Sequence, residues 1–550
     1  MKKIYILSSL VLAGALTSCY DLNTEPMGSS ITEKQRDELI DRDESKISGL
    51  SDGIYKYYNE FGWFVGDYYD FGYPSIMLAL DCRTADFLSA NVDLYGWFAG
   101  CAKFTDNTAS NGYTAMKWDL PYGIIYASNQ LIDYITEEQA QDNYYKNLLG
   151  QAYGNRAFAY WVLAQLFQFN YAQFDAAGNP YKDKMCVPII TEKNYAEVQE
   201  KGAPRASVAE VYDQILSDLN TGIEMMTNNP YATRVDKRYI DINVLFALRA
   251  RTYLCMQEYD KAAADAQKVI DSGAFRPLSA QEAIGPGFNS ISDPNWIWGI
   301  YYYMEDATGL YTLPGFMGSY TYGYAYAGMA KCITNTLFSQ INDNDPRKLW
   351  WTNPNKGGES NANYYTDAVV TADSGVSSAA EYVQAFFPSY ATTKYAPYMN
   401  VIGQSDNQAD IPLIRIEEMY YILAEALGKG QAGNAAGITA LENFVNDYRW
   451  LDSKAPYKFA DTGKTFMEEI FFQREVEFWG EGMTYYDILR LNLPILRSNT
   501  SWTNESYDMV RYAFDIYSNN PILIFQIPQS EIDNNPALSE SDQNEIGSVI

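Results

Sequence analysis

Three carboxylates near the C-terminus are the residues best spaced for acid–base chemistry. Glu475, Glu477 and Glu481 lie within seven positions of one another, beside Arg474. A glycoside hydrolase needs two carboxylates about 5–10 Å apart across a cleft, but nothing in the sequence indicates a cleft here. The chain contains no histidine, which excludes Ser-His-Asp and Cys-His catalysis. We therefore expect these glutamates to form an ion network that pins helix ends, and we expect no catalytic residues.

Aromatic residues are the second group that could do chemistry, by stacking. Tyrosine occurs 48 times, and aromatic residues make up 15% of the chain. An alternating row of tyrosines would place all its rings on one face of an extended segment. Such a row could stack on the apolar C–H faces of sugars, or the rings could cover the scaffold or meet a partner protein. The candidate ligand-binding residues are Tyr320, Tyr322, Tyr324, Tyr326, Tyr95, Trp97 and Tyr69, with Asp81 and Arg83 as polar contacts.

The N-terminus carries a processing signal. Lys2 and Lys3 precede an apolar run from Ile4 to Leu16, which is too short to span a bilayer of about 30 Å. The run ends in Leu16-Thr17-Ser18-Cys19, the pattern of a bacterial lipoprotein signal. We expect cleavage before Cys19 and attachment of lipid to it; the alternative is an ordinary signal peptide with a chance cysteine. Residues 1–18 are then the signal peptide and 19–35 a lipidated tether.

Metal and cofactor motifs are not evident. The five remaining cysteines form no C-x-x-C pair, and a bridge between Cys82 and Cys101 is the only pairing considered. The run 342–345 resembles a calcium loop but lacks its glycine and terminal glutamate, so we expect a turn before Pro346. We expect no metal and no cofactor. A formal charge of −29 argues against nucleic acid as a partner.

Helical patterns dominate the elements that must position these residues. Ser207 and Glu210 form a capping box before an apolar stripe, and Asp241 can cap a helix that leads into a second helix ending near Gly273. The helix pair within 242–273 resembles a tetratricopeptide repeat; the alternative is a generic helical hairpin. Other helices are expected at 118–135, 143–168, 413–428 and 466–479.

We therefore expect a mostly α fold. Its scaffold would be tetratricopeptide-like, with about four helix pairs and a large irregular, loop-rich binding portion. The expected portions are 36–274, which carries the repeat-like helices, and 275–550, packed with the former as one unit. Residues 275–410 are rich in Gly, Pro, Asn, Ser and Tyr, which is typical of irregular recognition segments.

Several motifs, in the same order along the chain, resemble the SusD/RagB family of outer-membrane lipoproteins. They are Arg156-Ala157 with Tyr160; Arg415-Ile416-Glu417-Glu418-Met419-Tyr420; Gln473-Arg474-Glu475-Val476-Glu477-Phe478-Trp479-Gly480-Glu481-Gly482; and Phe525-Gln526-Ile527-Pro528, which resembles a closing strand and turn. The lipoprotein signal and the helix pair within 242–273 fit as well.

The resemblance implies a binding protein and not an enzyme. Members of that family capture nutrients at the cell surface of Bacteroidetes, most often glycans, and sit on a SusC-like TonB-dependent outer-membrane transporter. We therefore expect a surface-exposed, lipid-anchored protein of the outer membrane that captures oligo- or polysaccharide and delivers it to such a transporter. A binder of peptides or another nutrient is the alternative, and a carboxylate-dependent glycoside hydrolase comes last.

Overall fold

The computed structural model describes residues 44–88, 97–232, 236–284, 287–302, 310–318, 320, 323–352, 369–371, 374–396, 401–403, 409–498 and 514–549. The chain divides into two compact units, residues 1–50 and 51–550. In the first unit, the described residues form a 3₁₀ turn, Glu44–Ile47, and the start of a helix. The predicted signal peptide, Cys19 and the tether lie outside the described residues. All contacts given below lie within the second unit.

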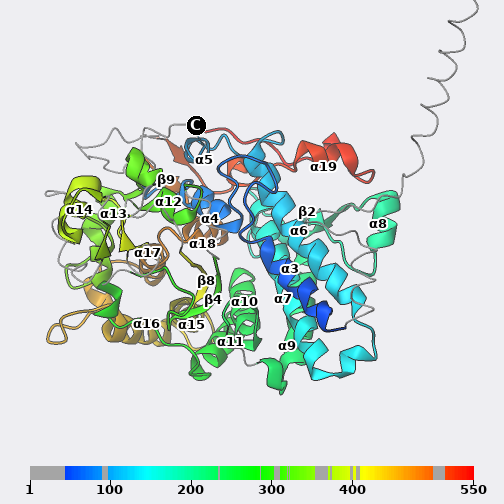
Figure 1. Cartoon of the computed structure of the whole chain (residues 1–550), viewed down its shortest axis with the longest axis horizontal. Coiled ribbons are helices and arrows are strands. Elements are labelled where there is room, and N and C mark those ends of the chain that lie inside the picture. Colours follow the sequence, from blue (N-terminus) through cyan, green and yellow to red (C-terminus); the bar gives the residue numbers. More distant parts are fainter. Residues whose placement is uncertain are drawn as a thin grey trace, which may run out of the picture. The chain divides into compact units, whose positions relative to one another are not determined.

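Helices make up most of the described secondary structure (Figure 1). The longer helices are α3 (Ser48–Lys56), α4 (Tyr73–Asp81), α6 (Gly112–Tyr134), α7 (Asn143–Phe167), α9 (Val208–Met226), α10 (Ile242–Cys255), α11 (Tyr259–Asp271), α14 (Ala379–Phe386), α15 (Ile416–Lys429), α16 (Asn434–Tyr448), α17 (Phe466–Glu477) and α18 (Met483–Leu491). The short helices are α5 (Ala99–Ala102), α8 (Tyr195–Lys201), α12 (Leu313–Met317), α13 (Asn335–Gln340) and α19 (Gln529–Asn534). Within the described ranges, no helix is both long and apolar enough to cross a membrane.

The strands are short and form pairs. Four pairs are antiparallel: β1 (Phe87–Leu88) with β5 (Cys332–Ile333), β2 (Met185–Pro188) with β3 (Arg205–Ser207), β4 (Trp296–Ile300) with β8 (Ile411–Arg415), and β9 (Ile495–Leu496) with β10 (Asp515–Ile516). Strands β6 (Val369–Val370) and β7 (Val401–Ile402) pair in parallel. The β4–β8 pair is buried along its length and joins segments more than 100 residues apart.

Successive helices form the scaffold. Helix α7 packs on α6 and α9, α10 on α9 and α11, and α15 on α11 and α16 (Figure 1). The predicted pair within 242–273 is the α10–α11 hairpin, with Ala247, Ala262 and Ala266 buried at its packed faces. These contacts confirm the mostly α, helix-paired fold expected from the sequence.

Local signals in the sequence place several helix ends correctly. The Ser207 side chain accepts a bond from the Glu210 backbone amide, and the Glu210 carboxylate accepts a bond from the Ser207 backbone amide. The predicted capping box is therefore present. Asp241 accepts bonds from the backbone of Asn243 and Val244. Gly273, with φ of 63°, follows α11 in the left-handed conformation that favours glycine. Each of these interactions satisfies backbone groups that the helix itself leaves unpaired.

Close contact between α15 and α16 depends on glycine. A Cβ atom at Gly437 would lie 2.5 Å from the Cα of Gly428 and 2.7 Å from the carbonyl oxygen of Ala424. Both neighbours are backbone atoms of the facing helix and cannot move aside alone. The crossing is therefore possible only without a side chain at this position.

Three expected elements differ from the structure. The helix expected at 118–135 begins at Gly112, where the Asn111 side chain caps it by accepting a bond from the Tyr113 amide. The helix expected at 413–428 begins at Ile416, because residues 411–415 extend as β8 and pair with β4. The closing strand expected at Phe525–Ile527 is not a strand. The Phe525 amide donates to the Leu166 carbonyl, but this bond is not part of a strand pairing. Residues from Gln529 form α19. Tertiary partners decide the last two segments, which their local sequence does not reveal.

The cysteines and the acidic run at 342–345 play structural parts. Cys82 and Cys101 are buried thiols that form no disulfide, as are Cys186, Cys255 and Cys332, so the Cys82–Cys101 bridge considered from the sequence is absent. Asp345 caps the 3₁₀ turn η7 (Pro346–Trp350) by accepting a bond from the Arg347 amide, as the predicted turn requires. Among the described residues, no group of acidic side chains and cysteines could hold a metal ion.

The predicted carboxylate network lies at the centre of the second half of the chain. Glu477 is fully buried and pairs with Arg415, Arg449 and Arg347 at 2.9, 2.8 and 3.1 Å. Glu481 pairs with Arg415 at 2.7 Å and with Lys394 at 2.6 Å. These guanidinium and ammonium groups come from β8, the end of α16, η7 and the chain before β7, so the network ties four distant segments to the end of α17.

The pKa values of the buried groups reflect the charges around them. Burial alone would raise the pKa of Glu477, but Arg449, Arg415 and Arg347 hold it well below its usual range. Burial lowers the pKa of Lys394 to about 8, although Glu481 opposes that shift. Glu475 is not part of the network; burial, reinforced by the nearby Asp86, raises its pKa well above the usual value. Glu477 and Glu481 therefore act as buried counterions, as expected from the sequence.

We predict that Glu477→Gln lowers the free energy of unfolding by about 3–5 kcal/mol, because it leaves three buried arginines short of a negative charge. Chemical denaturation followed by circular dichroism measures the change. Glu197→Gln is the matched control, since Glu197 pairs with Lys201 at the surface with its side chain 65% exposed, and it should change stability by no more than about 0.5 kcal/mol. Equal effects of the two substitutions would contradict the central role of the network.

Candidate functional site

The loop between α3 and α4 presents aromatic side chains and is held closed at its base. The Tyr73 amide donates to the Tyr58 carbonyl at 2.9 Å. Within the loop, the buried Asp70 carboxylate accepts bonds from the amides of Phe64 at 2.8 Å and Val65 at 2.7 Å. Burial raises the pKa of Asp70, while these amide bonds oppose the rise. The loop is thus fixed by its own backbone, which preorganises the rings it carries.

Three rings stack in a row at the surface. Tyr311 lies against Tyr68, with ring centres 4.4 Å apart and planes 10° from parallel, and against Phe61, at 5.1 Å and 19°. Tyr68 is 45% exposed and Phe61 36% exposed. Phe61 and Tyr68 come from the loop at 59–72, and Tyr311 comes from the segment before α12, some 240 residues later. We call Phe61, Tyr68 and Tyr311 the aromatic platform.

A second layer of rings supports the platform from below. Trp97 meets Tyr68 edge-on at 5.7 Å and Tyr324 edge-on at 5.2 Å. Phe316, on α12, stacks on Tyr324 at 4.8 Å and on Phe71 at 5.5 Å. Trp97 is only 8% exposed, so it stabilises the platform and offers little of its own face. Edge-on and offset stacks are the favourable geometries for aromatic pairs.

The structure brings two of the aromatic residues singled out in the sequence to the platform and places the other described ones elsewhere. Trp97 and Tyr324 lie at the platform. Tyr69 is buried against Tyr113, at 4.1 Å, and burial raises the pKa of its hydroxyl. Tyr320 is buried beside Phe387, and Tyr326 packs on Phe386. Tyr95 and Tyr322 lie outside the described residues.

The predicted extended row at 320–326 is wrong from residue 324 onward. Residues Ala325–Met329 form a single wide helical turn, the π turn η6, with Tyr324 at its N-terminal end. In a helical turn, residues two apart point to different sides, so Tyr324 and Tyr326 diverge. Tyr324 packs at the platform while Tyr326 meets α14.

Asp81 and Arg83 lie in the interior and not at a surface. Asp81 accepts a bond from the Gly482 amide at 2.9 Å. Arg83 pairs with Asp106 and donates to the Ile522 carbonyl at 2.6 Å, with its guanidinium over the Phe104 ring. Asp81 is 2% exposed and Arg83 is fully buried. The prediction that they offer polar contacts to a ligand is therefore wrong for this conformation, because burial leaves them no ligand-facing surface.

Sequence reasoning missed Phe61 and Tyr311. Phe61 lies in Phe61-Gly62-Trp63-Phe64, where three aromatic residues surround a glycine in a polar loop, and Trp63 is 62% exposed. Such a run in a loop is a usable signal, because exposed apolar side chains in irregular segments often mark binding surfaces. Tyr311 has no comparable signal, since only the fold brings it to Tyr68.

Two sequence families match the chain. Residues 83–254 match a SusD-like family described as starch-binding and associating with the outer membrane, and residues 280–546 match the SusD family, also called SusD/RagB. A SusD-like protein of Formosa agariphila is 25% identical over 511 residues, covering 88% of this chain and 90% of the relative. A second SusD-like protein of that species is 24% identical over 406 residues, covering 70% of this chain and 72% of the relative.

Solved structures share the fold. A SusD-like carbohydrate-binding protein of Bacteroides vulgatus superposes with a TM-score of 0.69 at 21% identity, covering 91% of this chain and 98% of that one. A laminarin-binding SusD-like protein superposes with a TM-score of 0.61 at 16% identity, covering 91% and 98%. The two family matches occupy separate and successive parts of the chain, in the order that the motifs predict. The chain belongs to the SusD/RagB family.

Proposed function

We propose that this chain captures a glycan on the aromatic platform. The stacked, exposed rings of Tyr68 and Phe61 on Tyr311 are the observation that carries the proposal. Sugar rings present apolar C–H faces that pack on aromatic faces, while their hydroxyls remain in water. The platform is held in place before the ligand arrives, so little ordering opposes binding.

The relatives support a glycan over other nutrients. The structural neighbours include a carbohydrate-binding and a laminarin-binding protein. We propose that the ligand is bound without chemical change. Glu477 and Glu481, the carboxylates best spaced for acid–base chemistry, are paired with buried arginines and Lys394. A peptide or another nutrient on the same platform is the second candidate, because tyrosine-rich surfaces also suit polar peptides.

We predict that Tyr68→Ala weakens binding of the cognate oligosaccharide by about 1 kcal/mol or more, roughly fivefold, since exposed aromatic anchors concentrate binding energy. Isothermal titration calorimetry of the purified protein measures the change. Tyr517→Ala is the matched control, because Tyr517 is 58% exposed and lies outside the platform; it should bind as the wild type does. Wild-type affinity of Tyr68→Ala would contradict the site, and shortened sugar products would contradict binding without catalysis.

We propose further that the chain is anchored by lipid to the outer membrane and faces the outside of the cell. The signal ending at Cys19 supports this anchoring, and one matched family is described as associating with the outer membrane. Several acyl chains, at about 0.8 kcal/mol per buried CH₂, would give a stable anchor.

Cys19→Ala should therefore release the protein from membranes or stall its processing. Fractionation of cells, with immunoblotting of the membrane and soluble fractions, tests the prediction. The substitution should be made in cells without the transporter partner, so that protein contacts do not hold the chain at the membrane. Unchanged membrane association in that background would show that Cys19 carries no essential anchor.

Delivery of the ligand requires a partner, because a surface-bound protein cannot move its ligand across the membrane alone. We propose a SusC-like TonB-dependent transporter, on which this chain acts as a lid with the platform facing the transporter. When the lid shuts, the ligand is enclosed and gains contacts with the transporter. These added contacts would favour the closed state of the complex. A permanent complex of this kind buries about 2,000 Å² or more.

Affinity purification from native membranes in mild detergent should therefore recover a large outer-membrane protein in stoichiometric amount. Mass spectrometry of the recovered complex identifies the partner. Recovery of this chain alone, under conditions that keep other outer-membrane complexes intact, would contradict the lid arrangement and leave a free-standing surface binder.

A further inference from the structure

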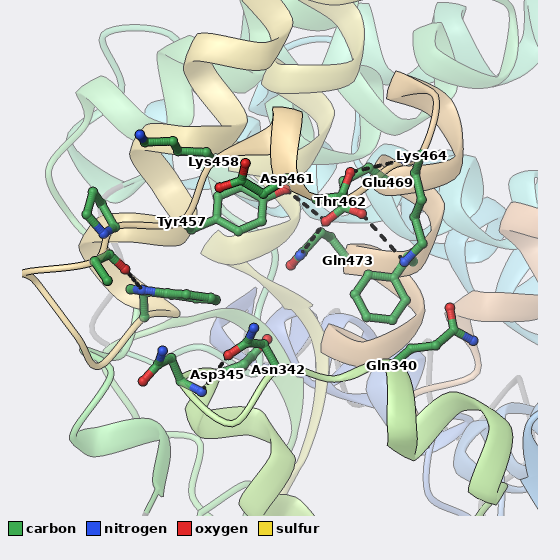
Figure 2. Close-up of a pocket in the computed structure, with 15 residues that line it drawn as sticks. Gln340, Asn342, Asp345, Tyr457, Lys458, Asp461, Thr462, Lys464, Glu469 and Gln473 are labelled. Atoms are coloured by element: carbon green, nitrogen blue, oxygen red, sulfur yellow. Dashed lines mark hydrogen bonds and ion pairs between the residues drawn. The ribbon is translucent and has the colours of Figure 1, made fainter.

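A pocket of about 420 Å³ lies away from the aromatic platform and shares no residue with it (Figure 2). Its wall comes from the turn after α13, the segment between α16 and α17, and the first turns of α17. Ligand pockets commonly range from about 300 to 1,000 Å³, so this one suits a small molecule or one unit of a larger one.

Glu469 gives the pocket an unsatisfied acceptor. Its Oε1 atom accepts bonds from the Tyr457 hydroxyl at 2.8 Å and from the Gln473 amide at 2.8 Å. Its Oε2 atom is buried, has no hydrogen-bond partner among the described residues, and lies 3.6 Å from the Lys464 ammonium. The residue is 1% exposed. A buried carboxylate oxygen left in this state is costly, and a ligand hydroxyl that donates to it would recover much of that cost.

Aromatic rings form the apolar part of the wall. The Lys464 ammonium lies 3.4 Å from the centre of the Phe472 ring. The Trp450 indole donates to the Ala455 carbonyl at 2.7 Å, and this bond fixes the orientation of its ring, whose centre is 5.7 Å from that of Tyr457. The pocket thus joins oriented ring surfaces with polar groups at fixed positions (Figure 2).

The charges of the pocket favour a neutral ligand. Lys464 already occupies the position of a bound cation, between the Phe472 ring and Glu469. The charged residues that line the pocket are mixed in sign: Lys458 and Lys464 are cationic, and Asp345, Asp461 and Glu469 are anionic. A ligand of either sign would therefore meet groups of its own sign at close range. A neutral molecule with neighbouring hydroxyls can donate to Glu469 Oε2, accept from Lys464 and lay its C–H groups on the rings.

We propose that this pocket is a second carbohydrate site, which takes a single neutral sugar unit. It is separate from the proposed platform site and does not depend on it. The pocket is enclosed on several sides by α17 and the segment before it, so it would recognise one unit and not a run of several. Affinity for a free monosaccharide in such a site is expected to be on the order of 1 mM.

Saturation-transfer-difference NMR with free glucose, galactose and mannose tests the proposal. We expect the wild-type protein to transfer saturation to at least one of these sugars. Ala455→Trp fills the pocket from an exposed position. Glu469→Gln keeps an oxygen for the bonds from Tyr457 and Gln473 but replaces Oε2 with an NH₂ donor. Each substitution should weaken the interaction at least tenfold. Ser453→Trp is the matched control, because Ser453 is exposed on the same turn and does not line the pocket.

The variants also separate the two sites. Tyr68→Ala should leave monosaccharide binding unchanged if the sugar occupies the pocket. Circular dichroism and thermal unfolding identify any variant that fails to fold, and either pocket variant alone is sufficient for the test. No transfer to any of the three sugars, undiminished transfer in either pocket variant that folds, or transfer lost in Tyr68→Ala would each overturn the proposal.

Discussion

The buried pairing of Arg415 with Glu477 and Glu481 is the constraint on which the second half of the structure depends. Each charge taken out of water costs several kcal/mol unless partners surround it. Arg415 bonds both carboxylates, and Glu477 also receives Arg449 and Arg347. Removing any one of these side chains would leave a buried charge without its full set of partners. The segments that carry these groups must therefore assemble together, which makes the fold of this region cooperative.

The same network reaches the aromatic platform through the turn at 480–482. The Gly480 carbonyl accepts a bond from the Tyr395 hydroxyl at 2.6 Å, and a Cβ at Gly480 would lie 2.6 Å from a side-chain atom of Met317, the last residue of α12. The Gly482 amide donates to Asp81 at the end of α4. Helix α12 carries Phe316, and α4 follows the loop that carries the platform rings. Asp81 thus ties the turn at 480–482 to α4, the helix that follows the platform loop.

The sequence predicts those parts of the fold that local interactions decide. Helix starts at Ser207 and Asp241 follow from capping side chains. The counterion role of Glu477 is expected from its place on a helix that carries an arginine, although its actual partners, Arg347, Arg415 and Arg449, come from distant segments. The strand at 411–415 and the π turn at 325–329 do not follow, because they depend on distant partners. In the candidate site, aromatic type and loop context point to the region where the rings of the platform gather.

Which rings face solvent depends instead on the tertiary fold. Tyr68 and Tyr69 are neighbours in sequence, yet one is 45% exposed and the other buried against Tyr113. Tyr68 stacks on Tyr311, which lies some 240 residues later in the chain, so no local residue pattern specifies which of the two neighbouring rings is exposed.

The way the chain uses its charges also limits the kind of function it can have. An acid–base pair must keep at least one carboxyl group free to exchange a proton with substrate near neutral pH. Glu477 and Glu481 cannot do so without releasing buried arginines, because their negative charge is what balances those arginines. Asp81 and Arg83 are likewise held inside. Proton exchange by Glu477 or Glu481 would require the chain to release the buried arginines that these two carboxylates balance.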